Sequence, residues 1–152
     1  ESSIYEKSFL ETIVGAAVFY LPSGSELWSG KMSRDALKSF LPETKFSGKI
    51  VKEHEYPRKV AAKYLLEEDW DKGNIVAKLR KLYLNKYGRY NYVTSEENGK
   101  LRKYQKVDCF QNPCECYREA GIQLINNLDQ NKLKQIKSQN KEVISDLLAS
   151  NK

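Results

Sequence analysis

The single histidine of this chain, His54, is the side chain best suited to acid–base chemistry near neutral pH. It lies in the run Glu53-His54-Glu55-Tyr56-Pro57, whose flanking carboxylates should raise its basicity and could hold a cation. One histidine excludes mechanisms that need two, such as paired-histidine cleavage of RNA and the His-Glu-x-x-His zinc site. The sequence also contains no glycine-rich phosphate loop, dinucleotide-binding fingerprint or hydrolase nucleophile elbow. Catalysis by this chain would therefore depend on His54.

A second candidate, Asn98, follows a stretch rich in aromatic and β-branched residues, Arg89–Thr94, that leads into a helix. Thr94 and Glu97 have the spacing of a capping box, which puts Asn98 in the first turn of that helix. Its amide oxygen is a hard ligand of the kind that Mg²⁺ accepts. Each candidate also has a plainer interpretation, because His54 could belong to an ordinary surface strand and Asn98 to an ordinary polar helix turn.

Both stretches resemble the HNH nucleases, also called ββα-metal or His-Me finger endonucleases. In that family an acidic residue and the catalytic histidine, followed by x-x-Pro, lie on the first strand, and the second strand leads into a helix with an Asn or His metal ligand. The resemblance covers Lys49–Pro57 and Tyr90–Lys103, under a fifth of the chain. It implies that His54 is the general base that activates water. It also implies that Glu53, in place of the usual Asp, and Asn98 hold Mg²⁺ or another divalent cation such as Mn²⁺.

The chain departs from the family pattern in three respects. His54 and Asn98 are 44 residues apart, so the resemblance implies a divergent member with an insertion between the two strands. The middle Asn of the family name has no clear counterpart, although Asn74 or Asn91 could serve. The CxxC pairs that bind zinc in some members are missing from this sequence.

The charge of the chain favours an anionic partner. Twenty-six Lys and Arg against 20 Asp and Glu give a net charge of +6. The segment 72–106 holds ten basic and two acidic residues, a local balance of +8, and five of the ten tyrosines. Basic residues interleaved with aromatic ones suit phosphate contact and base stacking, although a solvated helix face gives the same pattern. The residues expected to contact nucleic acid are Arg58, Lys78, Lys81, Arg89, Lys100, Arg102 and Lys103.

Hydrophobic patterning indicates the elements that must position these side chains. Two strands are expected at Gly48–Tyr56 and Arg89–Thr94, as a short β-hairpin followed by a helix. Helices are expected at Ser8–Leu21, Arg34–Leu41, Pro57–Leu65, Asn74–Tyr87, Ser95–Lys106, Asn112–Leu124 and Gln130–Ala149. The first of these is apolar on nearly all sides and is expected to be buried. The predicted fold class is α+β and mostly helical, in a single domain (1–152) with a ββα-metal-like nuclease core at about 48–106.

The cysteines and the hydropathy of the chain indicate where in the cell the protein is expected. Cys109, Cys114 and Cys116 form an odd set, best explained as half-buried small residues at a helix start, with a metal or disulfide shared with another chain as the alternative. They suggest a reducing, cytoplasmic location. The longest apolar run, Ile13–Leu21, has nine residues, whereas a spanning helix needs about 20, so neither a membrane partner nor a signal peptide is expected.

The favoured function is therefore a metal-dependent endonuclease that hydrolyses DNA, with RNA as the alternative substrate and a homodimer as the form suited to double-strand cleavage. Two other functions remain open. The chain could be a non-catalytic nucleic-acid-binding module in which His54 is incidental, or a ribonuclease toxin domain that uses His54 with a lysine and no metal. Metal dependence separates the first function from the other two, and turnover separates the second from the third.

Overall fold

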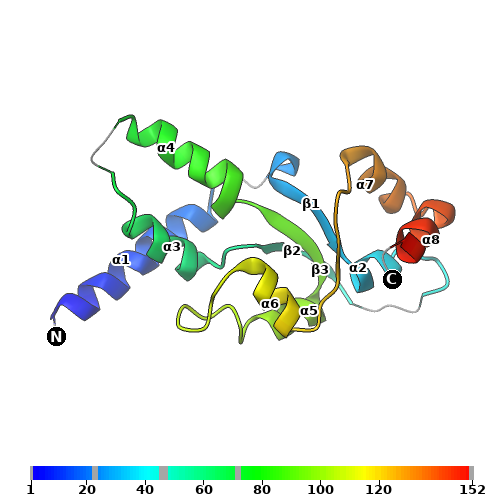
Figure 1. Cartoon of the computed structure of the whole chain (residues 1–152), viewed down its shortest axis with the longest axis horizontal. Helices are drawn as coiled ribbons and strands as arrows, with labels where there is room; N and C mark the ends of the chain where they lie inside the picture. Colours follow the sequence, from blue (N-terminus) through cyan, green and yellow to red (C-terminus); the bar gives the residue numbers. More distant parts are fainter. Residues whose placement is uncertain (1, 22–23, 45–47, 71–72, 151–152) are drawn as a thin grey trace.

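A four-stranded mixed sheet lies at the centre of the computed structural model, which describes residues 2–21, 24–44, 48–70 and 73–150 (Figure 1). The strands are β1 (Trp28–Ser33), β2 (Ile50–His54), β3 (Tyr90–Thr94) and β4 (Leu124–Ile125). Their order across the sheet is β2-β3-β1-β4. The central pair β1 and β3 is parallel, whereas both outer pairs are antiparallel. The chain therefore has the predicted α+β class, with more strands than the expected hairpin.

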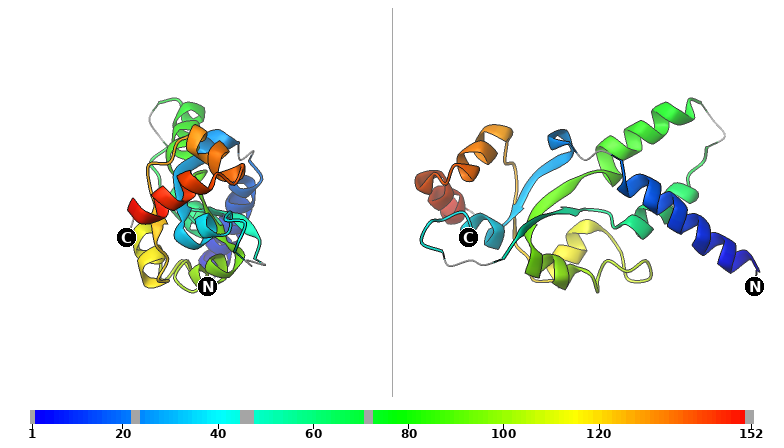
Figure 2. Two further views of the ribbon diagram at one scale, coloured as in Figure 1. Left: turned by 90° about the vertical axis from the view of Figure 1, so that its right-hand side faces the viewer. Right: turned by 180° about the vertical axis from the view of Figure 1, so that it is seen from behind.

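The helices gather at the two ends and along one side of the sheet, which gives the molecule an elongated shape (Figures 1 and 2). At one end lie α1 (Ser2–Phe19), α3 (Arg58–Leu66) and α4 (Ile75–Leu82), which continues as the π-helical turn η2 (Tyr83–Tyr87). At the other end lie α2 (Arg34–Lys38), α7 (Gln130–Lys137) and α8 (Lys141–Ser150). The remaining side carries α5 (Ser95–Leu101) and α6 (Pro113–Glu119), and a short 3₁₀ turn, η1 (Ser25–Leu27), precedes β1. None of the described helices is both long and apolar enough to cross a membrane.

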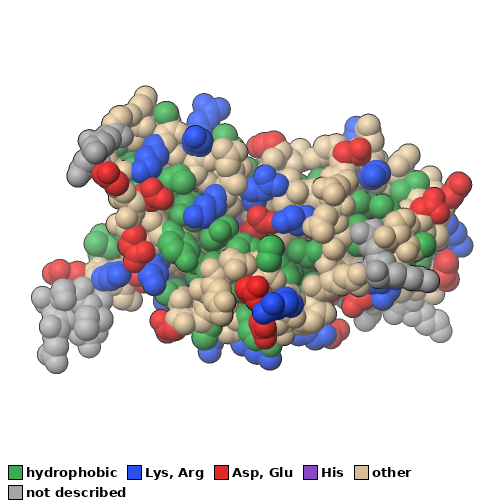
Figure 3. Space-filling model, viewed as in Figure 1, with side chains coloured by type: hydrophobic (Ala, Val, Ile, Leu, Met, Phe, Trp, Pro, Cys, Tyr) green, Lys and Arg blue, Asp and Glu red, His purple; other side chains and the backbone are tan. Residues whose placement is uncertain are grey.

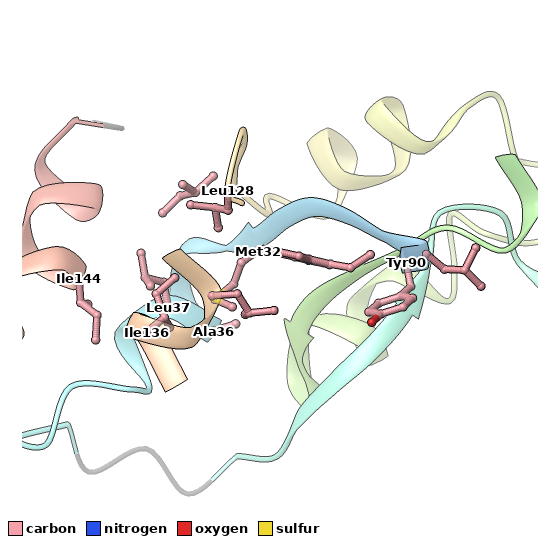
Figure 4. Close-up of a cluster of buried hydrophobic side chains, with 11 residues drawn as sticks. Met32, Ala36, Leu37, Tyr90, Leu128, Ile136 and Ile144 are labelled. Atoms are coloured by element: carbon pink, nitrogen blue, oxygen red, sulfur yellow. The ribbon is translucent and has the colours of Figure 1, made fainter. Parts of the chain in front are cut away.

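Three clusters of buried side chains join the helices to the sheet. The largest includes Met32, Leu37 and Ile136, and Figure 4 shows it extending from Tyr90 to Ile144. A second cluster, centred on Val93, Leu101 and Tyr117, packs α5 and α6 against the sheet. The third lies between α1, α3 and η2 and contains Ala61, Leu65 and Tyr87. Burial of these apolar side chains fixes the helices that surround the end of β2.

The predicted strand pair is confirmed, because β2 and β3 pair antiparallel from Ile50 opposite Thr94 to His54 opposite Tyr90. The two strands are not joined by a tight turn, since α3, α4 and η2 lie between them in the chain. Sequence patterning missed β1 and β4. In β1, Gly30 has a φ of +78°, and a Cβ there would lie 2.8 Å from the Leu128 carbonyl oxygen. A glycine required by close backbone approach breaks the alternating pattern of a strand.

Most predicted helix starts are confirmed by their caps. The Ser33 hydroxyl accepts a hydrogen bond from the Ala36 amide at 3.0 Å, and Asn112 caps α6 in the same way. The predicted C-terminal helix is wrong in one respect, because it is divided into α7 and α8. Gln139 between them has a φ of +58°, and the Asn140 side chain accepts from the Val143 amide at 3.2 Å, so a new helix begins there.

The expectation that the first helix is buried is also wrong. It packs on α3 through Val14 and Val18, but Phe9 and Ile13 are 65% and 50% exposed. The amphipathic helix α4 likewise buries none of its residues fully. Both helices therefore present apolar side chains to solvent, and they lie at the same end of the molecule (Figure 2).

Candidate functional site

The C-terminal end of β2 borders a pocket of about 210 Å³, here called the site pocket. Glu53 and His54 from β2, Asn98 from α5 and Arg58 from the first turn of α3 all line it. Its other lining residues are Val18, Lys52, Tyr56, Pro57, Ala61, Tyr87 and Gln105. The structure thus brings the predicted base, both predicted cation ligands and one predicted phosphate contact to a single cavity.

Glu53 is the most constrained of these side chains. It is only 5% exposed, and its carboxylate accepts hydrogen bonds from the Tyr117 hydroxyl and the Gln105 amide. The Asn91 amide donates in turn to the Tyr117 oxygen at 2.8 Å, and the Ser29 hydroxyl donates to Asn91. These five residues form a continuous network, here called the Glu53 network. It fixes the orientation of a buried carboxylate whose polar neighbours are all hydrogen-bonded.

Burial also changes the acidity of this network. It raises the pKa of Glu53 from 4.5 to about 7, and the hydrogen bonds from Tyr117 and Gln105 limit the rise. Burial, followed by the charge of Glu53, raises the pKa of Tyr117 well above its usual range. Tyr117 therefore stays protonated and donates to Glu53. The carboxyl itself ionises near neutral pH, where a positive charge beside it would favour the carboxylate.

His54 pairs with Tyr90 across the sheet, and the two rings meet edge to face with their centroids 6.4 Å apart. The flanking carboxylates do not raise its basicity as expected. Burial, and secondly the charge of Lys52, lower the pKa of His54 below 6.5. Glu55 instead forms ion pairs with Lys31 at 2.9 Å and Arg89 at 4.0 Å. A lowered pKa leaves the imidazole neutral at pH 7, the form that can accept a proton.

Asn98 owes its position to the start of α5. Thr94 and Glu97 form the predicted capping box, with the Glu97 amide donating to the Thr94 hydroxyl at 3.1 Å. Since β3 runs directly into α5, Asn98 lies one helical turn beyond the strand end and lines the site pocket. Of the two asparagines proposed for the middle position of the family pattern, Asn74 caps α4 and Asn91 belongs to the Glu53 network. Only Asn91 is next to the candidate site.

One buried polar atom at the site pocket has no protein partner. Among the described side chains, the Tyr87 hydroxyl is the buried polar group left without a hydrogen bond. Tyr87 lines the site pocket, and burial raises its pKa to about 12, so the hydroxyl remains a donor. An unsatisfied buried donor costs about 1–3 kcal/mol.

The side chains at the site pocket could supply only a few ligands to a cation. No group of three or more His, Cys, Asp or Glu that could hold a metal occurs in the described part of the chain. The two predicted oxygen ligands, the Glu53 carboxylate and the Asn98 amide, belong to residues that line the pocket, as does the Gln105 amide that donates to Glu53. They fit Mg²⁺ because this ion often takes one or two protein ligands and completes its shell with water and phosphate oxygens. They do not fit a structural zinc site, which needs four protein ligands.

A large open groove adjoins the site pocket and shares Pro57, Arg58 and Gln105 with it. The groove has a volume of about 1190 Å³, and six basic residues line it against two acidic ones. The basic residues of this groove, here called the basic groove, are Lys7, Arg58, Lys59, Lys63, Arg102 and Lys106. A positive groove of this kind attracts a phosphate backbone.

The fold places the residues predicted to bind nucleic acid on different surfaces. Arg58 and Arg102 line the basic groove, whereas the other five line neither hollow. Lys78 and Lys100 form ion pairs with Glu68 and Glu96 at 3.0 and 2.8 Å. Arg89 donates to the Ser29 carbonyl, Lys103 lies over the Tyr104 ring, and Lys81 is exposed on α4. The local charge of +8 is therefore spread over several faces.

Sequence analysis did not identify Tyr117, Gln105 and Ser29 at the site, or Lys7, Lys59 and Lys63 in the groove, whereas Lys106 belongs to the predicted basic segment 72–106. A tyrosine on an apolar helix face gives no signal of function, because most such residues are core. Asn91 offered a clue, since it is a polar residue inside an aromatic strand and is completely buried.

The three cysteines are free, and only Cys116 fits the expected role of a small residue buried at a helix start. Cys109 and Cys114 are exposed, and Cys116 is buried with its thiol donating to the Tyr104 carbonyl at 3.3 Å. Burial raises the pKa of Cys116 to about 11, so it is a packing residue rather than a nucleophile.

Comparisons with known proteins add no relative to this picture. The chain matches no family model, no curated protein and no solved structure. The functional interpretation therefore depends on the geometry of the site pocket and the basic groove.

Proposed function

We propose that the protein is a metal-dependent endonuclease of the ββα-metal (HNH) type that hydrolyses phosphodiester bonds in DNA. One observation supports this proposal above all others. Glu53, His54 and Asn98 come from two distant parts of the sequence, yet they line one pocket that opens beside a basic groove. A base, two hard oxygen donors and a phosphate-binding surface are the parts that metal-assisted hydrolysis requires.

The order of elements is compatible with this family. Two antiparallel strands, β2 and β3, precede α5, with the acid and the histidine at the end of the first strand and the amide on the helix. The segment between the strands forms α3, α4 and η2, which accounts for the long spacing between His54 and Asn98. In this proposal α3 belongs to the substrate-binding surface, because its first residue, Arg58, lines both hollows.

Each side chain has a defined role in the proposed reaction. The neutral His54 imidazole takes a proton from a water molecule, whose oxygen forms a new bond to phosphorus as the bond to the 3′ oxygen breaks. Glu53 and Asn98 hold a divalent cation, which when bound stabilises the charge on the departing oxygen. The Glu53 network orients the carboxylate before the substrate arrives. The departing 3′ oxygen takes a proton from solvent, so the products are a 5′-phosphate and a 3′-hydroxyl.

Incubation of the chain with supercoiled plasmid and with RNA, in Mg²⁺, in Mn²⁺ or in EDTA, tests the proposal directly. We expect metal-dependent cleavage of DNA, blocked by EDTA. The His54→Ala variant should cleave about 10²–10⁴-fold more slowly while it binds DNA normally. Cleavage of RNA alone in EDTA would favour the metal-free ribonuclease. Binding without turnover would favour the non-catalytic module, and equal cleavage by His54→Ala from two independent preparations would refute the role of His54.

A further inference from the structure

One end of the molecule is unusually apolar. The ten large apolar side chains that are exposed in the described part of the chain all lie in or next to α1, α3 and α4–η2. They are Phe9, Leu10, Ile13, Tyr20, Leu21, Leu66, Ile75, Val76, Leu79 and Leu84. Concentration of all such side chains at one end differs from the scattered pattern of an ordinary surface. We call this end the apolar face.

The apolar face contains a groove of about 460 Å³ between α1, α3 and α4. The described residues that line it are all apolar, from Ile13 and Leu21 on one wall to Ile75 and Leu79 on the other. An amphipathic helix such as α4 gains most of its stability by covering its apolar side. In the isolated chain that side stays open, since Ile75 and Val76 are 53% and 76% exposed.

The exposed area suits an interface between proteins. The exposed fractions of the ten side chains add up to about five fully exposed residues. At roughly 150–200 Å² for each large side chain, the face offers on the order of 800–1,000 Å² of apolar surface. A stable interface buries about 800 Å² on each partner.

Charged side chains of both signs lie at the edge of the apolar face. Glu67 and Asp69 follow α3, and Arg80 and Lys81 belong to α4, all of them exposed; Glu67 also forms an exposed ion pair with Lys7 at 3.8 Å. Figure 3 shows basic and acidic side chains side by side with apolar ones at this end of the molecule. A rim with both signs suits a second copy turned by two-fold symmetry, which sets each acidic side against a basic one. The four rim charges cancel, so they offer no net attraction to an anionic membrane or nucleic acid.

We propose that the apolar face is the interface of a homodimer, in which two copies of this chain bury α1 and α4 against each other. Arg80 and Lys81 of one copy lie opposite Glu67 and Asp69 of the other. The proposal does not depend on the nuclease function, because His54 is not part of the face and the apolar groove shares no residue with the basic groove.

Light scattering during gel filtration tests the dimer over a range of micromolar concentrations. We expect a mass of twice 17.6 kDa at the upper end of the range. The double variant Ile75→Glu/Val76→Glu should weaken self-association at least about 100-fold, because it buries four extra charges in the dimer. Both positions are exposed in the monomer, so circular dichroism should show an unchanged fold. The matched control Ala149→Glu, on α8 at the opposite end, should dimerise like the original chain.

Charge reversal gives an independent check. Arg80→Glu/Lys81→Glu should weaken the dimer, and addition of Glu67→Lys/Asp69→Lys in the same chain should restore it. A folded chain that stays monomeric at every concentration would overturn the proposal, as would an unchanged dimer in Ile75→Glu/Val76→Glu. Binding of the monomer to phosphatidylcholine–phosphatidylserine vesicles through this face would show that a membrane covers it instead.

Discussion

The Tyr117 hydroxyl donates a hydrogen bond to the Glu53 carboxylate across 64 positions of the sequence. Asn91 and Ser29 extend this contact through β3 to β1, so three strands and α6 support one carboxylate. A polar network of this size in the interior is costly to build unless every member is satisfied. The network holds Glu53 in one orientation at the site pocket.

Tyr117→Phe should therefore damage both the fold and the site. The substitution removes one of the two hydrogen bonds that Glu53 accepts and the acceptor of the Asn91 amide NH₂, both in a buried place, which should cost about 1–3 kcal/mol of unfolding free energy. If Glu53 holds the cation, its loss of orientation should also weaken Mg²⁺ affinity by about 10–100-fold. Urea unfolding and Mg²⁺ titration of the cleavage rate measure the two effects.

Tyr104→Phe provides the matched control, because the Tyr104 ring packs against the same cluster as Tyr117. It should leave the Mg²⁺ titration unchanged. Equal shifts in both variants would mean that the network has no special relation to the site.

Glu53→Gln should make the protein more stable at alkaline pH, in contrast to Tyr117→Phe. The folded-state pKa of Glu53, about 7, is above its ordinary value of 4.5, so the folded chain favours the protonated carboxyl. The stabilisation is complete below pH 4.5 and is lost as the pH rises to about 7. The amide imitates the protonated acid and does not titrate. At pH 8 in EDTA the variant should gain up to about 3 kcal/mol over the original chain.

Urea unfolding at pH 4 and pH 8 measures this difference, with Glu96→Gln as a control at an exposed position. A gain in stability combined with loss of cleavage is the trade-off expected of a functional residue. A loss of stability at both pH values would identify Glu53 as a structural acid.

Part of the site could be located from the sequence because it depends on patterns within short stretches of the chain. The strand pair, the Thr94–Glu97 capping box and the helix after Pro57 each depend on a few consecutive residues, and each is present in the structure. The antiparallel pairing and the following helix then place Glu53, His54 and Asn98 at one pocket. These three residues lie at one pocket because of the order of the elements, although they are far apart in the sequence.

Other features depend on tertiary contacts and left no local pattern. The strand β1 contains a glycine at positive φ and two serines, and it is recognisable only from its pairing with β3 and β4. The apolar helix α1 looks like a core helix, but only one side of it is covered by α3. The basic groove combines α1, α3 and the segment after α5, so its charge does not appear in any single window.

His54→Ala and Glu53→Ala should differ in their response to metal. Removal of the base lowers the cleavage rate without changing how the cation is held, so no metal concentration should restore His54→Ala. Removal of the carboxylate weakens cation binding, so excess Mg²⁺ or Mn²⁺ should partly restore Glu53→Ala. Metal titrations of both variants under single-turnover conditions make this comparison. Restoration of both variants to the same degree would contradict the separate roles.

The basic groove should dominate the salt dependence of DNA binding. Lys59→Ala/Lys106→Ala removes two charges from the groove, and Lys132→Ala/Lys134→Ala removes two from α7 at the opposite end (Figure 1). Both variants lower the net charge equally, from +6 to +4, so only location distinguishes them. If both groove lysines contact phosphates, the slope of log Kobs against log salt should fall in magnitude by about 2 in the first variant.

Fluorescence anisotropy with a labelled duplex, at several salt concentrations, measures the two slopes. A catalytically inactive background such as His54→Ala keeps the duplex intact during the titration. The α7 variant should retain the original slope, because long-range attraction from α7 is screened beyond about 10 Å at ordinary salt. Equal changes in both variants would mean that DNA responds to total charge and is not held in the groove. A larger change from Lys78→Ala/Lys81→Ala would transfer the binding surface to α4, away from the site pocket, and would separate binding from the proposed chemistry.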